Sequence, residues 1–86
     1  MRSQTTRLFR RLLSDLPIEA QRDALRAYRL FRNNPGHPSL QFKKLEGEHD
    51  IYSARISLGY RALAVMKDDL VLWYWIGSHA EYDRLV

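Results

Sequence analysis

The sequence predicts an α+β fold in the order (β)-α-α-β-β-β, with a helical hairpin packed on a small antiparallel sheet. Two stretches with apolar residues at helical spacing come first, within residues 7–32. Three stretches of alternating or continuous apolar residues follow within residues 51–76, joined by tight turns. Helices that precede strands in this way pack together on one face of the sheet. With 86 residues, the chain is expected to form a single domain over residues 1–86 with one modest core.

The first third of the chain predicts a helical hairpin, preceded at most by a brief edge strand at Met1–Thr6. A first helix begins at Arg7 and ends at the Ser14–Pro17 break. A second helix runs from about Pro17 to Arg32, because proline is favoured at the first helical position. The residues expected on the buried faces are Leu8, Phe9, Leu12, Leu13 and Leu16 in the first helix, and Ala24, Leu25, Tyr28 and Phe31 in the second.

The rest of the chain predicts strands. Their expected bounds are Leu40–Leu45, Ile51–Leu58, Tyr60–Met66 and Leu70–Ile76, with turns at 46–50, 59 and 67–69. The last three strands form an antiparallel meander, and the final one is expected to be central. Trp73 and Trp75 should share one face of this strand, with Tyr74 on the other. Packing in the core is the favoured interpretation of this pair, because tryptophan buries a large apolar area; a stacking platform is the alternative if the rings are exposed.

Composition restricts the classes of function. The chain has 14 Lys and Arg against 10 Asp and Glu, a net charge of +4, so a polyanionic partner is expected: nucleic acid, the ribosome or an acidic protein. The absence of cysteine excludes disulfides, thiolate nucleophiles and zinc–thiolate sites. His37 and His49 fit no metal-ligand spacing, so neither a metal nor another cofactor is expected. No apolar run reaches the length of a membrane span, and a cytoplasmic location without membrane contact is predicted.

Two arginines near the turn at Gly59 are candidates for binding phosphate. A three-residue loop at Ser57–Gly59 would place Arg55 opposite Arg61, with both side chains on the solvent face. A two-residue loop would place them on opposite faces. In the first register the pair matches the forked geometry by which guanidinium groups bind phosphate. The alternative is two solvated arginines on an antiparallel sheet.

The residues after the last predicted strand are candidates for acid–base chemistry. Histidine side chains ordinarily titrate at about pH 6.5, so His79 can exchange a proton at neutral pH. Tyr82 follows three residues later and would lie on the same side of a helical turn, where it can stack on a base or direct its hydroxyl to a phosphate. The structural alternatives are that His79 caps a helix and that Tyr82 packs against the end of a small core. Lys43 and Lys44 add charge that can bind a nucleic-acid backbone.

These segments together resemble the RelE/ParE superfamily of toxins from bacterial type II toxin–antitoxin systems, over most of the chain from Arg7 onward. The segments that carry the resemblance are LSDLP, FRNNPGHPSL, FKKLEG, YSARISLGYRALAV and WIGSHAEYDRL. The superfamily fold is a β-α-α-β-β-β arrangement with an antiparallel sheet, the order expected above. The resemblance also implies a cognate antitoxin, a small acidic protein, as partner.

RelE-like members cleave mRNA on the ribosome without a metal, through attack of the 2′-hydroxyl of the RNA on the adjacent phosphate. By position, the resemblance implies that Arg61 stabilises the phosphate, Arg55 binds substrate, and His79 and Tyr82 occupy the place of a histidine or tyrosine found in some members. One departure is clear. Some members carry a glutamate base before the second strand, where this chain offers Ser39 and no carboxylate; Glu46 falls in the following turn.

Three functions therefore remain open at the level of sequence. The first is a metal-independent, ribosome-dependent mRNA endoribonuclease. The second is a ParE-like inhibitor of DNA gyrase, or a catalytically silent homologue that only binds its antitoxin, since a shared fold does not fix activity. The third is a general nucleic-acid-binding domain without a toxin role.

Overall fold

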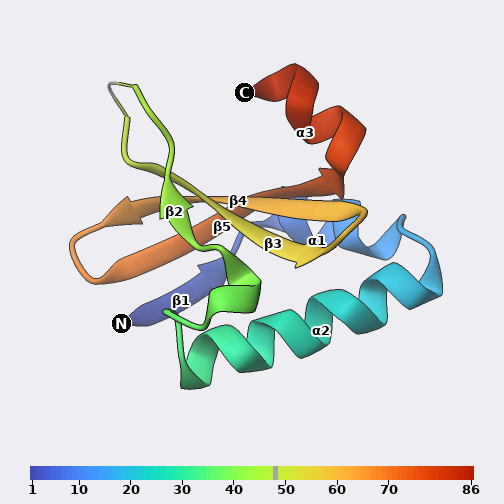
Figure 1. Ribbon diagram of the computed structural model, residues 1–86, viewed down its shortest axis with the longest axis horizontal. Coiled ribbons are helices and arrows are strands. Elements are labelled where there is room, and N and C mark those ends of the chain that lie inside the picture. The colour runs from blue at the N-terminus through green and yellow to red at the C-terminus, as the bar shows by residue number, and fades with distance from the viewer. Residues whose placement is uncertain (48) are drawn as a thin grey trace.

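A computed structural model describes residues 1–47 and 49–86 and contains one five-stranded sheet (Figure 1). The strand order is β1-β5-β4-β3-β2, so β5 is an interior strand, although β4 and not β5 takes the predicted central place. The strands are β1 (Arg2–Thr5), β2 (Lys43–Lys44), β3 (Ile51–Ser57), β4 (Tyr60–Lys67) and β5 (Leu70–Ser78). The predicted turn at 46–50 includes residue 48, which lies outside the described residues.

Three α-helices and one 3₁₀ turn complete the fold, which confirms the predicted α+β class. They are α1 (Arg7–Ser14), α2 (Ile18–Asn33), the 3₁₀ turn η1 (Pro38–Leu40) and α3 (His79–Leu85). Figure 1 shows α2 running along one face of the sheet, while α3 projects from the opposite face at the end of β5. Within the described part of the chain, no helix is long and apolar enough to cross a membrane.

The N-terminal segment does form a strand, and it makes the sheet mixed. β1 pairs in parallel with β5, whereas β2 to β5 pair antiparallel as predicted. The Arg2 side chain bonds the Asp69 carboxylate at 3.1 Å, and the backbone N–H of Thr6 donates to the Trp73 carbonyl at 2.9 Å. The Thr6 hydroxyl then accepts from the Phe9 N–H and caps α1. Thr6 therefore ends β1 and begins the helix at once.

The predicted strand Leu40–Leu45 is wrong in its first half. Pro38 begins a 3₁₀ turn that ends at Leu40, and the His37 ring accepts a hydrogen bond from the Ser39 N–H at its start. Gln41 then takes a left-handed conformation (φ 45°), which cannot continue an extended strand. Only Lys43–Lys44 remain to pair with β3.

The core lies between α2 and the sheet. Phe31 contacts Trp73 and Phe42 edge-to-face, with ring centroids 5.2 and 4.9 Å apart. The predicted buried positions Leu8 and Leu25 are instead 49% and 51% exposed. The buried face of α2 is formed by small residues with one aromatic, namely Ala20, Ala24, Ala27 and Phe31. Because alanine is short, this face lets the helix lie close to β3, and the stripe is rotated away from Leu25.

A β-bulge separates the two tryptophans, so the prediction that they share a face is wrong. Ala64 pairs with Trp73 but Leu63 pairs with Trp75, which leaves Tyr74 as an extra residue in β5. Trp73 is 4% exposed in the core beside α2. Trp75 is half-buried on the opposite face, with Tyr74, and burial there raises the pKa of the Tyr74 phenol.

Candidate functional site

The candidate site lies where β3, β4 and β5 meet the turn at Leu58–Gly59. Arg55 pairs with Arg61, and Arg61 pairs in turn with Gly77, so three strands contribute one row across the sheet. This confirms the register in which the two arginines are opposite. The turn itself has only two residues, however, and a bulge between Arg55 and Ser57 supplies the residue that aligns the pair.

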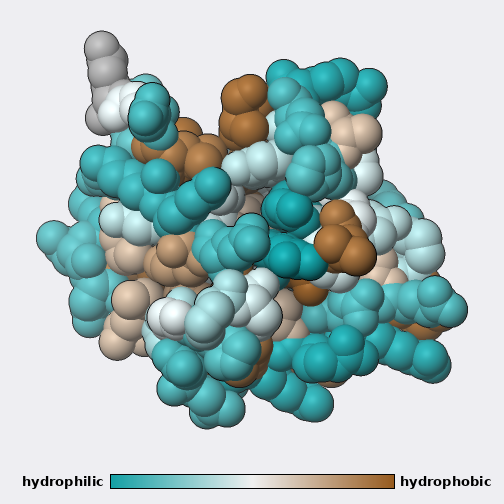
Figure 2. All heavy atoms as spheres, viewed as in Figure 1, coloured by the Kyte–Doolittle hydropathy of each residue, from teal (hydrophilic) through white to brown (hydrophobic). Residues whose placement is uncertain are grey.

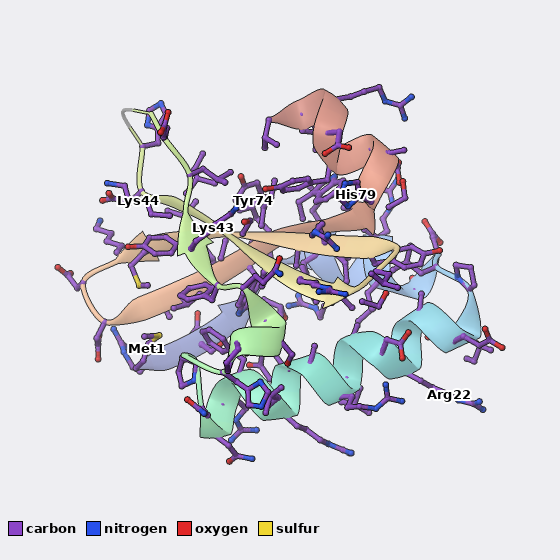
Figure 3. All side chains as sticks on the ribbon, in the orientation of Figure 1. Met1, Arg22, Lys43, Lys44, Tyr74 and His79 are labelled. Atoms are coloured by element: carbon purple, nitrogen blue, oxygen red, sulfur yellow. The ribbon has the colours of Figure 1, made fainter. Side chains whose placement is uncertain are left out.

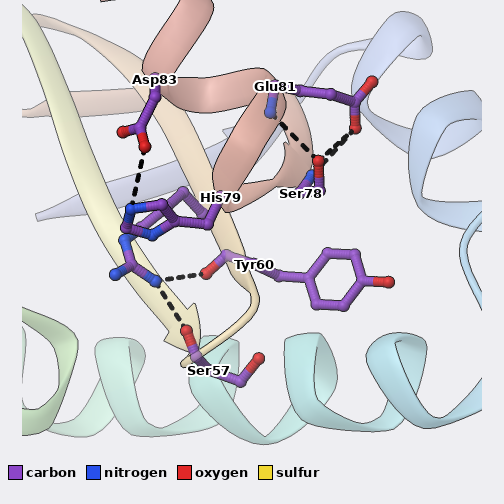
Figure 4. A network of polar contacts seen from close by, with 7 residues as sticks. Ser57, Tyr60, Ser78, His79, Glu81 and Asp83 are labelled. Carbon is purple, nitrogen blue, oxygen red and sulfur yellow. Dashed lines mark hydrogen bonds and ion pairs between the residues drawn. The ribbon is translucent and has the colours of Figure 1, made fainter.

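Arg61 is anchored by the same turn. One guanidinium nitrogen, Nη1, donates to the Ser57 carbonyl at 2.7 Å and to the Tyr60 carbonyl at 3.0 Å (Figure 4). Arginine has five N–H donors, so Nε and Nη2 stay available to an anion. The side chain is half-buried, which reduces the screening of its charge by water. Arg61 is therefore a fixed cation with free donors.

Arg55 is half-buried as well and borders a hollow of about 350 Å³ beside α2, together with Arg26 and Ser39. Within the described part of the chain, its guanidinium forms no hydrogen bond or ion pair. A half-buried cation without a protein acceptor favours an anionic ligand. Arg55 and Arg61 thus lie opposite each other on neighbouring strands, but in the part of the chain described only the Arg61 guanidinium is held by protein carbonyls.

His79 begins α3 beside the turn. Its backbone N–H donates to the Gly59 carbonyl at 2.8 Å, so the turn that anchors Arg61 also fixes the start of this helix. Its imidazole Nε2 lies 3.2 Å from Oδ2 of Asp83, one helical turn later, and the side chain is 47% exposed (Figure 4). When Nε2 carries the proton shared with Asp83, Nδ1 is free to accept one.

Tyr82 lies on the same side of α3 as His79, as predicted. The two ring centroids are 6.3 Å apart, and Tyr82 is half-buried. A capping box holds the helix start: the Ser78 hydroxyl accepts from the Glu81 N–H at 3.1 Å, and the Glu81 carboxylate accepts from the Ser78 N–H at 3.0 Å. The Ser78 N–H and the Ser78 hydroxyl both donate to the Glu81 carboxylate, and these two hydrogen bonds lower the pKa of Glu81.

The predicted lysines lie apart from this group. Lys43 and Lys44 pair with β3 on the side away from β5, and Figure 3 shows them across the sheet from His79. Lys44 Nζ forms an exposed ion pair with Asp50 at 3.1 Å. Strands are about 4.8 Å apart, and one strand, β3, lies between β2 and β4, the strand that carries Arg61. These lysines can contact a different part of a long ligand.

Two features of the site were not found in the sequence. Asp83 was overlooked as a partner of His79, although the spacing of four residues places both on one helix face. The Ser78–Glu81 capping box was also overlooked, although its S-x-x-E pattern is readable. Ser39 stands where some members of the superfamily carry a glutamate base, and its hydroxyl forms a hydrogen bond with the His37 ring at 2.9 Å. Among residues 1–47 and 49–86, no three His, Asp or Glu side chains cluster to hold a metal ion.

The site brings two cationic side chains close to an imidazole that can exchange a proton. Arg61 and Arg55 can bind a phosphate, and His79 lies next to the turn that anchors Arg61. These are separate tasks in phosphodiester chemistry, since one group stabilises developing negative charge and another moves a proton.

Comparison with known proteins places this chain among toxins. The family model described as the ParE-like toxin domain matches residues 19–84. The toxin of a RelB–RelE complex from Methanococcus jannaschii has a TM-score of 0.75 at 18% identity, covering 96% of this chain and 99% of that one.

Two further complexes contain similar chains. The RelE–RelB complex from Pyrococcus horikoshii gives a TM-score of 0.70 at 22% identity, covering 90% of this chain and 92% of that chain. The RelBE2 toxin–antitoxin complex from Mycobacterium tuberculosis gives 0.63 at 26% identity, covering 92% and 91%. No curated protein sequence matches the chain significantly.

Proposed function

The chain belongs to the ParE-like toxin domain family, and from this premise we propose that it is the toxin of a toxin–antitoxin pair that cleaves mRNA on the ribosome. The observation that carries the proposal is the shared anchor at the β3–β4 turn. Carbonyls of Ser57 and Tyr60 hold the Arg61 guanidinium, and the Gly59 carbonyl holds the backbone of His79.

The chemistry follows from this placement. The 2′-hydroxyl of the RNA attacks the adjacent phosphorus, the bond from phosphorus to the 5′-oxygen breaks, and a 2′,3′-cyclic phosphate forms. Negative charge grows on the non-bridging oxygens, where the free donors of Arg61 stabilise it. Arg55 positions the phosphate. A proton leaves the 2′-hydroxyl and another reaches the 5′-oxygen, and His79 carries out one of these transfers.

Other predicted residues act around this centre. Tyr82, beside His79, orients or stacks on a base. Lys43 and Lys44, across the sheet, bind the RNA backbone farther along the strand. The net charge of +4 also favours a polyanionic ligand such as RNA. Similar structures contain RelB partners, and we propose a small acidic antitoxin as the partner here.

The test is cleavage of mRNA in a translating extract, with the new ends mapped by primer extension. Arg61→Ala is expected to lower the cleavage rate about 100-fold, as does loss of a preorganised charge-stabilising donor in other enzymes. The matched control is Arg22→Ala, an equal loss of charge on α2, where Figure 3 shows Arg22 pointing away from the sheet. Intact mRNA with the unaltered protein, or equal effects of the two substitutions, would refute the proposal.

A second candidate is inhibition of DNA gyrase, the ParE-like alternative. The observation that favours it is the lack, in the described residues, of a second carboxylate beside His79 that is free to act as a base. Asp83 contacts the histidine, and Glu81 caps α3. Inhibition of supercoiling with mRNA left intact would support this function instead. If neither activity is found while an antitoxin binds, the chain is a silent homologue.

A further inference from the structure

Trp75 occupies a position that the core does not explain. The bulge at Tyr74 turns it away from α2, where Trp73 packs. Trp73 is almost fully buried, and its Nε1–H donates to the Ser3 hydroxyl at 3.0 Å. Trp75 is half-buried, and among the described residues its indole N–H has no hydrogen-bond partner. A large aromatic left partly exposed, with its donor unused, suits contact with a ligand.

The Trp75 ring reaches the row that contains Arg61. A Cβ placed on Gly77 would lie 2.5 Å from Cζ2 and 2.7 Å from Cη2 of Trp75, so the six-membered ring lies directly over the glycine backbone. Gly77 pairs with Arg61 on the neighbouring strand, and neighbouring strands are about 4.8 Å apart. The indole therefore lies about one strand spacing from the backbone of Arg61.

A hollow with apolar walls opens above the ring. Its volume is about 620 Å³, and its lining includes Leu63, Tyr74 and Trp75 from the sheet and Leu85 from α3. Figure 2 shows the notch between α3 and the segment after β2, with apolar side chains on its walls. The hollow is open to solvent on a chain of net charge +4. Its position favours a ligand that carries both an anionic group and a flat apolar group.

We propose that Trp75 stacks on the nucleobase next to the phosphate held by Arg61. This rests on the proposed function, which makes the ligand single-stranded RNA. Stacking on a tryptophan tolerates every base, because each base has a π-face. Trp75 thus positions the strand without reading its sequence, while Gly77 keeps the space that the ring needs.

The test is tryptophan fluorescence on titration with a six-nucleotide 2′-O-methyl RNA of mixed sequence, which cannot be cleaved. Quenching is expected with the unaltered protein, and Trp75→Phe should remove most of it while keeping affinity within about threefold. Trp75→Ala should weaken binding at least tenfold, measured by anisotropy of a labelled oligomer. An abasic oligomer of equal length is the control, and it should bind through its phosphates without quenching.

A second variant probes the ring without altering it. Gly77→Ala adds a methyl group where Trp75 lies, and it should reduce quenching while circular dichroism stays unchanged. Equal quenching by the abasic oligomer, or unchanged RNA affinity in folded Trp75→Ala, would overturn the inference. These results are independent of cleavage, so a protein that leaves mRNA intact refutes the proposed function while the titration still decides the role of Trp75.

Discussion

Arg55 lies directly opposite Arg61 across β3 and β4, although only Leu58 and Gly59 form the turn between these strands. The bulge at Ile56 makes this possible. It adds one residue to β3 and so moves Arg55 from alignment with Ala62 to alignment with Arg61. The alignment of two phosphate-binding candidates is therefore a property of strand geometry.

The register can be tested with a disulfide, because the chain has no cysteine of its own. Arg55→Cys with Arg61→Cys should form a cross-link under mild oxidation, since opposite residues in an antiparallel pair lie within disulfide range. The control is the pair Arg55→Cys and Ala62→Cys, which would be opposite in a register without a bulge. This pair should form much less disulfide. Intact mass before and after reduction measures both, and a preference for the second pair would contradict the bulge.

Asp83 is expected to orient His79 through the 3.2 Å contact between Oδ2 and Nε2. Asp83→Asn should lower mRNA cleavage about tenfold and leave RNA affinity nearly unchanged, because the imidazole loses a fixed tautomer but no phosphate contact is removed. Imidazole ¹⁵N chemical shifts should show Nε2 protonated in the neutral parent protein. Asp69→Asn, at an exposed ion pair with Arg2, is the matched control. Equal cleavage by both variants would argue against an orienting role.

The start of α3 should depend on pH through Glu81. Its pKa is lowered in the folded protein by the hydrogen bonds from Ser78. A lowered folded-state pKa means that the capping contribution is fully present above the ordinary glutamate pKa and is lost as the pH falls through the lowered value. The Ser78 amide chemical shift, followed from about pH 6 to pH 2, should therefore titrate below the ordinary glutamate range.

Glu81→Gln is the control for this titration, because its amide oxygen can still accept from Ser78 but does not ionise. The Ser78 amide should then be nearly independent of pH. A midpoint at or above the ordinary glutamate value in the parent protein would mean that the capping box does not form in solution.

The two tryptophans should differ in their contribution to stability. Trp73→Ala is expected to lower the free energy of unfolding by about 3–5 kcal/mol, as is usual for an aromatic removed from a packed core. Trp75→Ala should cost less than half of that, because the ring is partly exposed already. Urea unfolding followed by far-ultraviolet circular dichroism measures both. Equal losses would place Trp75 in the core.

The order of elements could be predicted because it depends on local patterns. Apolar spacing indicated α1 and α2, turn residues separated the strands, and the family segments identified Arg61 and His79 as candidates. The prediction of a strand at Leu40–Leu45 was wrong because Gln41 adopts a left-handed conformation. Glutamine is not a residue type that indicates this conformation in a sequence. Leu25 was misplaced because a stripe of alanines, weak in hydrophobicity, packs more closely on a sheet.

The sequence by itself determined the α+β order, the basic surface and the residue types at the end of the last strand. The tertiary structure decided which of them meet. Two bulges, at Ile56 and Tyr74, align Arg55 with Arg61 and place Trp73 and Trp75 on opposite faces. A bulge changes the face of every later residue in a strand without changing its composition. Its position is set by packing on both faces of the sheet at once, which no local pattern records.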